Sequence, residues 1–492
     1  VVHRGQVRGQ VASHFKAARA LAVRDNPTQL REALAELAAL ERLDAESPDA
    51  QALSADVNAR LWLEHHQAEA QAEARAHLAR AQALESRSGE RYATQVLVLL
   101  SEGKAPAAAD FLADLERQGA RSPKLSLAEA RLLQARGRLA EARQALSRAS
   151  EDAWREPRYA AAQGEALLDE GLAAPAAEAF KKALNANPEH LRARLGLALA
   201  RLYEGGTGAD EAERLVTDVL ASPEALTPAL TARAYTVRAA RALAGGQTAP
   251  ALQALDAALA ASPGDVHALV IKARALALAK DPGARAAFEA AAAQRPTAPL
   301  PYLDGARVLQ AAGDGEGALA LLDGYERAFR DVRVTSAEGK STGALERDDR
   351  YWLARGQVLE ALTHGEDALA AYDRALSVRG LQRARAQYAK AALLLARGDS
   401  TAAQPLLAEL APESGQGTLP EAYEALGRLY FAQGEYALAC QHHYLGLSRA
   451  RAQGASLETL RPRGEELERR LLGAGQKALA QTWKQETEAL WR

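Results

Sequence analysis

The sequence predicts an all-α fold: a superhelix of about twelve helix pairs with a C-terminal helical cap. Three observations predict it. Of the 492 residues, 48% are apolar but only 5% are aromatic, so alanine and leucine, which favour helices, supply most of the apolar surface. Isoleucine, a strand former, is nearly absent. The same spacing of glycine and alanine recurs along much of the chain, and such self-similarity is typical of repeat architectures.

Charge, hydropathy and cysteine content exclude several classes of protein. The 61 lysine and arginine residues nearly balance the 63 aspartate and glutamate residues, for a net charge of −2, so bulk electrostatics cannot hold nucleic acid. No run of about 18 or more apolar residues occurs, which excludes a membrane span in this chain. A single cysteine excludes an internal disulfide framework and a zinc site built from cysteines.

The repeat has a period of 34 residues, marked by Gly103, Gly137 and Gly171. Five residues after each glycine stands an alanine, and four residues later a larger apolar residue, at Ala108, Ala142, Ala176, Leu112, Leu146 and Phe180. Glycine adopts the left-handed conformation of a tight turn at no steric cost. Small alanines let two helices approach closely, and the larger residue fills the space on the same helical face. Each unit is therefore predicted to be a helix, a glycine turn and a second helix.

This pattern resembles the tetratricopeptide repeat family, and the best unit matches successive signature positions at Tyr423, Leu426, Gly427, Tyr430, Gly434, Ala439 and Gly446. In that unit His443 stands where an aromatic residue is usual. Three further units carry much of the signature, at Trp352, Gly356, Leu359, Ala368, Tyr372 and Ala375, at Tyr235, Gly246, Ala251, Leu255, Ala258 and Pro263, and at Tyr302, Leu309, Gly313, Ala318, Leu322 and Tyr325. The resemblance covers residues 89–453 well and 12–88 poorly, and it implies a tetratricopeptide-repeat (TPR) solenoid.

Five regions are predicted along the chain. They are degenerate N-terminal helical repeats at 1–88, a repeat array at 89–330, a loop insertion at 331–347, the continued array at 348–453 and C-terminal capping helices at 454–492. Within the array, units begin near residues 89, 123, 157, 191, 232, 265, 299, 349, 384 and 420. The insertion is polar and aperiodic, which favours a long loop. The final helices would cover the last repeat, as the end of a solenoid requires.

The resemblance implies a concave groove lined by the first helix of each unit, suited to an extended peptide or to a helix of another protein. The family's inward-facing positions, carried over to this chain, include Lys124, Arg131, Arg158, Arg233, Arg307, Gln310, Arg350, Gln357, Arg385, Tyr388, Arg428 and Phe431. Arginine binds carboxylates in a bidentate manner and aromatic residues provide anchoring area, so the expected partner is a protein or extended peptide with acidic segments. The alternative is that these arginines are solvated or paired within the chain, because arginine is abundant throughout.

No residue pattern predicts catalysis, a cofactor or a metal site. Residues 339–342, Gly-Lys-Ser-Thr, resemble the end of a phosphate-binding loop but lack the required earlier glycine and a preceding strand. Adjacent histidines on a helix point about 100° apart, so neither His65-His66 nor His442-His443 can chelate one metal. His443 is expected to be a packing histidine and Cys440 a small buried hydrophobe.

The predicted function is a non-catalytic scaffold that binds protein partners in its groove and helps to assemble a bacterial multiprotein complex for motility, pilus formation, secretion or signalling. No nucleic-acid partner is expected. The alternative is a sensory or substrate-docking region of a larger enzyme, such as a kinase or glycosyltransferase, because the sequence begins Val1-Val2 and contains no methionine. A third alternative, an all-helical enzyme, would require catalytic histidines or a catalytic Cys440. The cytoplasm is the favoured location, and the periplasm would fit if an N-terminal segment had been removed.

Overall fold

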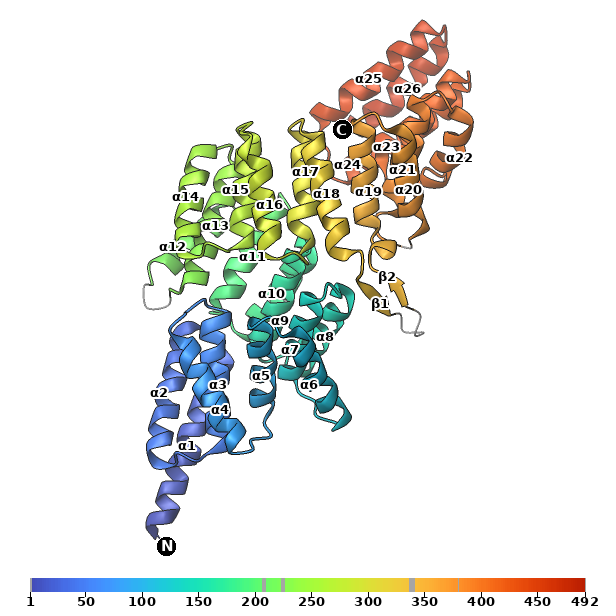
Figure 1. Cartoon of the computed structure of the whole chain (residues 1–492). Coiled ribbons are helices and arrows are strands. Elements are labelled where there is room, and N and C mark those ends of the chain that lie inside the picture. The colour runs from blue at the N-terminus through green and yellow to red at the C-terminus, as the bar shows by residue number, and fades with distance from the viewer. Residues whose placement is uncertain (1, 206–208, 223–225, 336–340, 379, 492) are drawn as a thin grey trace. The chain divides into compact units, whose positions relative to one another are not determined.

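In a computed structural model of the chain, residues 2–205, 209–222, 226–335, 341–378 and 380–491 are described. These residues form 26 α-helices and one pair of short strands (Figure 1). The chain divides into two compact units, residues 1–344 (unit 1) and 345–492 (unit 2). Within each unit, consecutive helices pack in pairs and successive pairs pack against each other. The prediction of an all-α fold built from helix pairs is therefore confirmed.

Unit 1 contains nine helix pairs among its described residues. Their bounds are α1 Val2–Arg24, α2 Pro27–Leu43, α3 Pro48–Leu63, α4 Ala70–Ala83, α5 Gly89–Ser101, α6 Ala105–Arg117, α7 Pro123–Ala135, α8 Leu139–Asp152, α9 Pro157–Asp169, α10 Ala173–Ala186, α11 Leu191–Tyr203, α12 Ala209–Leu220, α13 Pro228–Ala244, α14 Thr248–Ala261, α15 Val266–Leu278, α16 Gly283–Gln294, α17 Pro299–Ala311 and α18 Gly315–Phe329. From α5 onward, most first helices begin within one residue of the predicted unit starts. The exception, α13, begins at Pro228 because proline presets the helical backbone angle and the Thr227 hydroxyl accepts a hydrogen bond from the Leu230 amide at 3.4 Å.

The turn between α9 and α10 shows why glycine recurs. Gly171 has a φ of +74°, in the left-handed region. Its amide donates to the Leu168 carbonyl at 2.9 Å, and the Leu172 amide donates to the Leu167 carbonyl at 2.8 Å. These two bonds satisfy carbonyls that the helix end would otherwise leave unpaired, and they direct the chain into the next helix.

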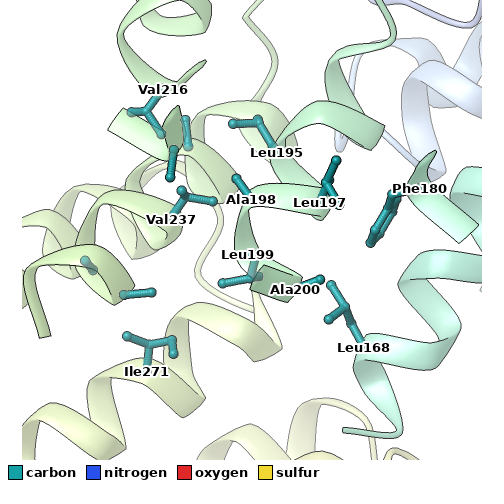
Figure 2. Packing of buried hydrophobic residues seen from close by; sticks show 14 of the residues in the cluster. Leu168, Phe180, Leu195, Leu197, Ala198, Leu199, Ala200, Val216, Val237 and Ile271 are labelled. Carbon is teal, nitrogen blue, oxygen red and sulfur yellow. The ribbon is translucent and has the colours of Figure 1, made fainter. Parts of the chain in front are cut away.

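The core of the repeats lies where the alanines were predicted. Ala108, Ala142 and Ala176 are buried, which lets paired helices approach closely. Phe180 of α10 is fully buried against two glycines, on α9 and α11, and a Cβ atom at either glycine would overlap its ring. Figure 2 shows Phe180 in the cluster that continues through α11, α13 and α15. One aromatic side chain thus joins two successive helix pairs.

The N-terminal helices pack differently from the later repeats. In α3, every residue from position 50 to 61 is buried, the polar ones included. A helix buried all round must contact partners on more than one side. Besides its partner α4, α3 packs against α5, and its side chains reach α9. Residues 50–61 are therefore enclosed by neighbouring helices, including helices of later repeats.

The segment expected to be a loop insertion contains an antiparallel strand pair, β1 Arg333–Thr335 and β2 Ser341–Gly343, followed by a short 3-10 helix at Leu345–Arg347. The first strand follows α18 of unit 1 directly along the chain. At their base, Val332 and Phe329 pack beside Gly137, where an added Cβ would lie 3.1 Å from Val332 and 3.2 Å from Phe329. The polar composition indicated a departure from the repeat, but it did not predict the strand pairing.

Unit 2 contains four helix pairs among its described residues: α19 Asp349–Ala361, α20 Gly365–Ser377, α21 Arg383–Ala396, α22 Ser400–Leu410, α23 Pro420–Ala432, α24 Tyr436–Ala452, α25 Leu457–Gly473 and α26 Lys477–Trp491. The last pair covers α24. Trp483 is 1% exposed, and its indole nitrogen donates to the Gly464 carbonyl at 2.8 Å. No described helix in either unit has the length and apolar character needed to cross a membrane.

Candidate functional site

The inner face of unit 1 is occupied by the chain's own N-terminal turns. Asn26, in the turn between α1 and α2, donates from its side-chain amide to the Glu189 carbonyl at 2.9 Å. Its side-chain oxygen accepts from the Leu191 amide at 3.0 Å. Asn187 in turn donates to the Arg24 carbonyl at 3.0 Å. These reciprocal bonds fasten the α1–α2 turn to the turn that precedes α11, although the two lie 163 residues apart in sequence.

Three consecutive residues after α3 contact three successive repeats. Glu64 is bonded to Arg158 of α9 at 2.6 Å and to Arg192 of α11. The His65 carbonyl accepts from the amide of Ala229, at the start of α13, at 3.4 Å. His66 has a left-handed backbone (φ +58°), and its Nδ1 lies 3.0 Å from the hydroxyl oxygen of Ser262, just after α14. We call residues 64–66 the crossing segment.

A buried ion-pair network accompanies these contacts. Arg60 of α3 lies 2.5 Å from Asp56 and 3.3 Å from Asp25. Arg158, which is only 3% exposed, lies 3.4 Å from Asp56 and also bonds Glu64. Burial opposes ionisation of Asp56, but the neighbouring charges of Arg60, Lys124 and Arg158 outweigh it and lower the pKa of Asp56 to about 2.

Sequence reasoning placed Lys124, Arg131, Arg158 and Arg233 in the unit 1 groove, and the structure brings all four to this inner face. Lys124 lies 3.5 Å from Glu90 and 3.9 Å from Asp56. Arg158 is enclosed by carboxylates, so it has no surface to offer a partner. Arg131 and Arg233 instead line a cavity. Lys124, Arg158 and also Arg131, which lies 3.8 Å from Glu165, are thus paired within the chain, whereas Arg233 forms no ion pair with a described residue.

The cavity, which we call the chamber, has a volume of about 540 Å³. It is lined by the first helices from α5 to α15 and by the crossing segment. Its larger apolar lining residues are Leu63, Leu97, Leu100, Leu230 and Val266, which together we call the apolar wall. Its charged residues are Glu64, Arg131, Glu165, Asp169, Arg192, Arg233, Asp265 and Arg295. The volume is within the range of pockets that hold small organic ligands.

The four chamber arginines differ in how completely they are paired. Arg192 makes a bidentate pair with Glu165, at 3.1 and 2.8 Å, and also bonds Glu64. Arg295 bonds Asp169. Arg131 reaches Glu165 only at 3.8 Å, and burial, incompletely offset by Glu165 and Glu64, lowers its pKa. Arg233 forms no ion pair with a described residue, and its buried Nε has no hydrogen-bond partner among them.

In unit 2, the predicted groove residues are mostly accessible. Arg385 of α21 and Arg428 of α23 are exposed, and Tyr388 between them is half-buried. Burial raises the pKa of Tyr388 while the charge of Arg428 lowers it, so these two side chains are close enough to interact. Phe431 is committed to the cap instead: the Arg470 guanidinium lies 4.6 Å from its ring centroid and the Tyr436 ring 5.1 Å. We call Arg385, Tyr388 and Arg428 the α21–α23 face.

The remaining predicted residues lie on α17 and α19. Arg307 of α17 is exposed and pairs with Asp304 at 2.8 Å, and Gln310 is half-buried on the same helix. Arg350, at the start of α19, has its Nε 3.7 Å from Asp348, and Gln357 is exposed on that helix. Arg307 belongs to unit 1 whereas Arg350 belongs to unit 2, so a single arginine wall from 307 to 428 stays a prediction.

The residues considered for chemistry have packing roles. His65 is buried, and burial lowers its pKa to about 4. Burial also lowers the pKa of His443 to about 4, and it raises the pKa of the Cys440 thiol to about 11. Gly339 and Lys340 lie outside the described residues. Among those that are described, no three histidine, cysteine, aspartate or glutamate side chains are arranged to hold a metal ion.

The chain was compared with known families, curated proteins and solved structures. No known family model matches the chain, and no curated protein does. A solved structure of a human IFIT1 dimer with PPP-AAAA is 17% identical, with 84% of this chain and 95% of that chain covered, at a TM-score of 0.44. The structure of a human IFIT1 dimer with m7Gppp-AAAA is also 17% identical, with 84% of this chain and 96% of that chain covered, at a TM-score of 0.45. A chain of the Cut9–Hcn1 hetero-tetramer of the APC/C is 13% identical, with 90% of this chain and 93% of that chain covered, at a TM-score of 0.37.

The fold is a solenoid of helix pairs, as the resemblance to the tetratricopeptide repeat family implies. Its helix pairs, glycine turns and buried alanines carry that assignment. Sequence reasoning missed three of the carboxylates on the inner face, namely Asp25, Asp56 and Glu64. One signal was available: Asp56, Asn58 and Arg60 interrupt the alanine and leucine of α3 at positions that a single apolar stripe would not leave polar.

Proposed function

We propose that the chain is a non-catalytic scaffold that docks an acidic segment of a partner protein on the α21–α23 face of unit 2. The supporting observation is that Arg385 and Arg428 are exposed and form no ion pair with any described residue, while the half-buried Tyr388 lies close to Arg428. Free guanidinium groups are available for bidentate bonds with carboxylates, and a half-buried tyrosine supplies contact area at low entropic cost. Repeat proteins commonly bind along such extended surfaces.

A protein partner fits this face better than nucleic acid does. The chain has a net charge of −2, and the face presents two unpaired arginines. Nucleic-acid binding without base readout relies on many phosphate contacts, whereas an acidic segment with an apolar anchor needs only a few charged contacts and one pocket. Assembly of a bacterial multiprotein complex is the wider role that we propose, on the strength of the family resemblance.

The test is capture of partners from an extract by the immobilised full chain, with mass spectrometric identification, followed by titration of an acidic peptide from the captured protein. Arg385→Glu combined with Arg428→Glu should weaken peptide binding at least about tenfold, because attraction becomes repulsion at both positions. The matched control is Arg461→Glu with Lys484→Glu, which makes the same charge change at exposed cap positions. Equal binding by the two double variants would remove the proposal.

A further inference from the structure

We propose that the chamber of unit 1 binds a small amphiphilic anion, whose carboxylate or phosphate group is held by Arg233 and Arg131 and whose apolar body packs against the leucine-rich wall. This site is separate from the α21–α23 face. Its occupant is a small molecule, and it does not depend on the scaffold function proposed above.

The chamber is lined by four carboxylates and four arginines, but guanidinium groups outnumber carboxylates around Glu165. This single carboxylate makes a bidentate pair with Arg192 and a 3.8 Å pair with Arg131, and the charge of Arg233 also acts on it. One carboxylate therefore faces three guanidinium groups, and the bidentate pair with Arg192 uses both of its oxygens. Arg131 and Arg233 therefore keep N–H groups that can donate hydrogen bonds to a further oxyanion.

The hydrogen-bond inventory identifies Arg233 as the main anchor. Arg233 lines the chamber, and its side chain makes no hydrogen bond or ion pair with a described residue, so its charge has no bonded counter-ion within the described part of the chain. An oxyanion in the chamber would accept hydrogen bonds from the terminal guanidinium nitrogens of Arg233. Arg192 and Arg295 already bond carboxylates, so they shape the chamber without requiring a ligand.

The apolar wall argues for an amphiphile over a bare ion. Leu63, Leu97, Leu100, Leu230 and Val266 line the same cavity as the guanidinium groups. A volume of about 540 Å³ exceeds what an inorganic anion fills, and apolar wall area is stabilised by contact with an apolar ligand. Ser101, Gly264 and Arg295 are exposed lining residues, so the chamber opens to solvent.

The crossing segment argues for a small molecule over an extended peptide. Residues 64–66 contact α9, α11, the start of α13 and the end of α14 in turn. An extended chain following the inner face past these helices would have to displace the segment and break its buried ion pairs. A small ligand fits beside it, because Glu64 and His66 themselves line the chamber.

Isothermal titration calorimetry on the full chain tests the proposal with four probes of equal chain length: octanoate, octyl phosphate, octanamide and octylamine. Octanoate, octyl phosphate or both should bind, and the neutral and cationic probes should bind at least about tenfold more weakly. Tighter octanoate binding would indicate a carboxylate ligand, and tighter octyl phosphate binding a phosphate ester. Absence of binding by both anions at millimolar concentration would overturn the proposal, as would equal binding of octanamide.

Three variants assign the site. Arg233→Gln should weaken anion binding at least about tenfold, or about 1.4 kcal/mol, and it leaves no carboxylate without a partner. Arg233→Lys should restore part of the affinity because it restores the charge. Arg238→Gln is the control: it lies on the same helix, but it pairs with Glu213 at 3.3 Å and does not line the chamber.

A second variant, Ser101→Trp, tests the same site without changing its charges. It is needed if circular dichroism shows that Arg233→Gln disturbs folding. Ser101 is exposed at the chamber opening, and its hydroxyl bonds only the Val98 carbonyl of its own helix, at 2.7 Å. Ser101→Trp should therefore obstruct the opening and weaken binding by a similar factor while the charges stay unchanged. Wild-type affinity in both Arg233→Gln and Ser101→Trp would place the ligand elsewhere and overturn the proposal.

Discussion

In unit 1, arginines of the first helices pair with carboxylates as far as 128 residues away in sequence, whereas in unit 2 the arginines of α21 and α23 face solvent. Both sets occupy inward positions of the same repeat. The difference arises because the N-terminal turns bring Asp25, Asp56 and Glu64 onto the inner face of unit 1. A repeat position therefore fixes where a side chain points, and the availability of that side chain depends on what else packs there.

The largest effect is expected from a substitution in the buried ion-pair network of unit 1. Arg158→Ala would remove a buried guanidinium that pairs with both Asp56 and Glu64 and would leave Asp56 with Arg60 and Glu64 with Arg192. We therefore expect a loss of about 3 kcal/mol in the free energy of unfolding of unit 1. Urea unfolding of the full chain, followed by hydrogen-exchange mass spectrometry, reports peptides from the two units separately.

The control for that variant is Arg397→Ala in unit 2. Arg397 bonds Glu366 on the surface, and exposed pairs contribute only about 0–1 kcal/mol. A loss below about 1 kcal/mol in Arg158→Ala as well would show that the network of unit 1 is as dispensable as a surface pair.

An intermediate effect is expected on the pH dependence of the stability of unit 2. The native pKa of His443 is about 4 against an ordinary 6.5, so the unfolded chain binds the proton more readily and stability falls as pH drops from about 6.5 toward 4. His443→Phe should remove about 2 kcal/mol of the stability difference between pH 8 and pH 5. His364→Asn, at an exposed position of unit 2, should leave that difference unchanged. An undiminished pH dependence in His443→Phe would contradict the assignment.

The smallest effect concerns the strand pair. Replacing residues 334–342 by two glycines should change the stability of unit 1 by no more than about 1 kcal/mol, because a two-stranded ribbon contributes little by itself and loop length is tolerated. Val332 and Phe329, which pack beside Gly137, remain in place. Hydrogen exchange in α7 and α18 checks the result, and a markedly faster exchange there would show that the strands support the repeat.

Much of the fold could be predicted because its determinants are local. A 34-residue frame fixed the turns at Gly103, Gly137 and Gly171, which all have left-handed backbones, and the buried alanines of the helix crossings. The inner face of unit 1 was not predictable in the same way. Asn26 and Glu189 meet across 163 residues, and such a contact leaves no periodic signal. Arg158 and Arg385 both stand at inward positions of the frame, yet one is enclosed and the other exposed.

The bonds between the α1–α2 turn and residues 187–191 also set an order of events during synthesis. The ribosome must add 163 further residues before Asn26 can meet its partner, which takes roughly 10–30 s at typical translation rates. For most of that interval Asp25, Asp56 and Glu64 lack their partners Arg158 of α9 and Arg192 of α11. The first two helix pairs therefore complete their packing only after the middle repeats emerge, so folding of unit 1 cannot proceed strictly from the N-terminus.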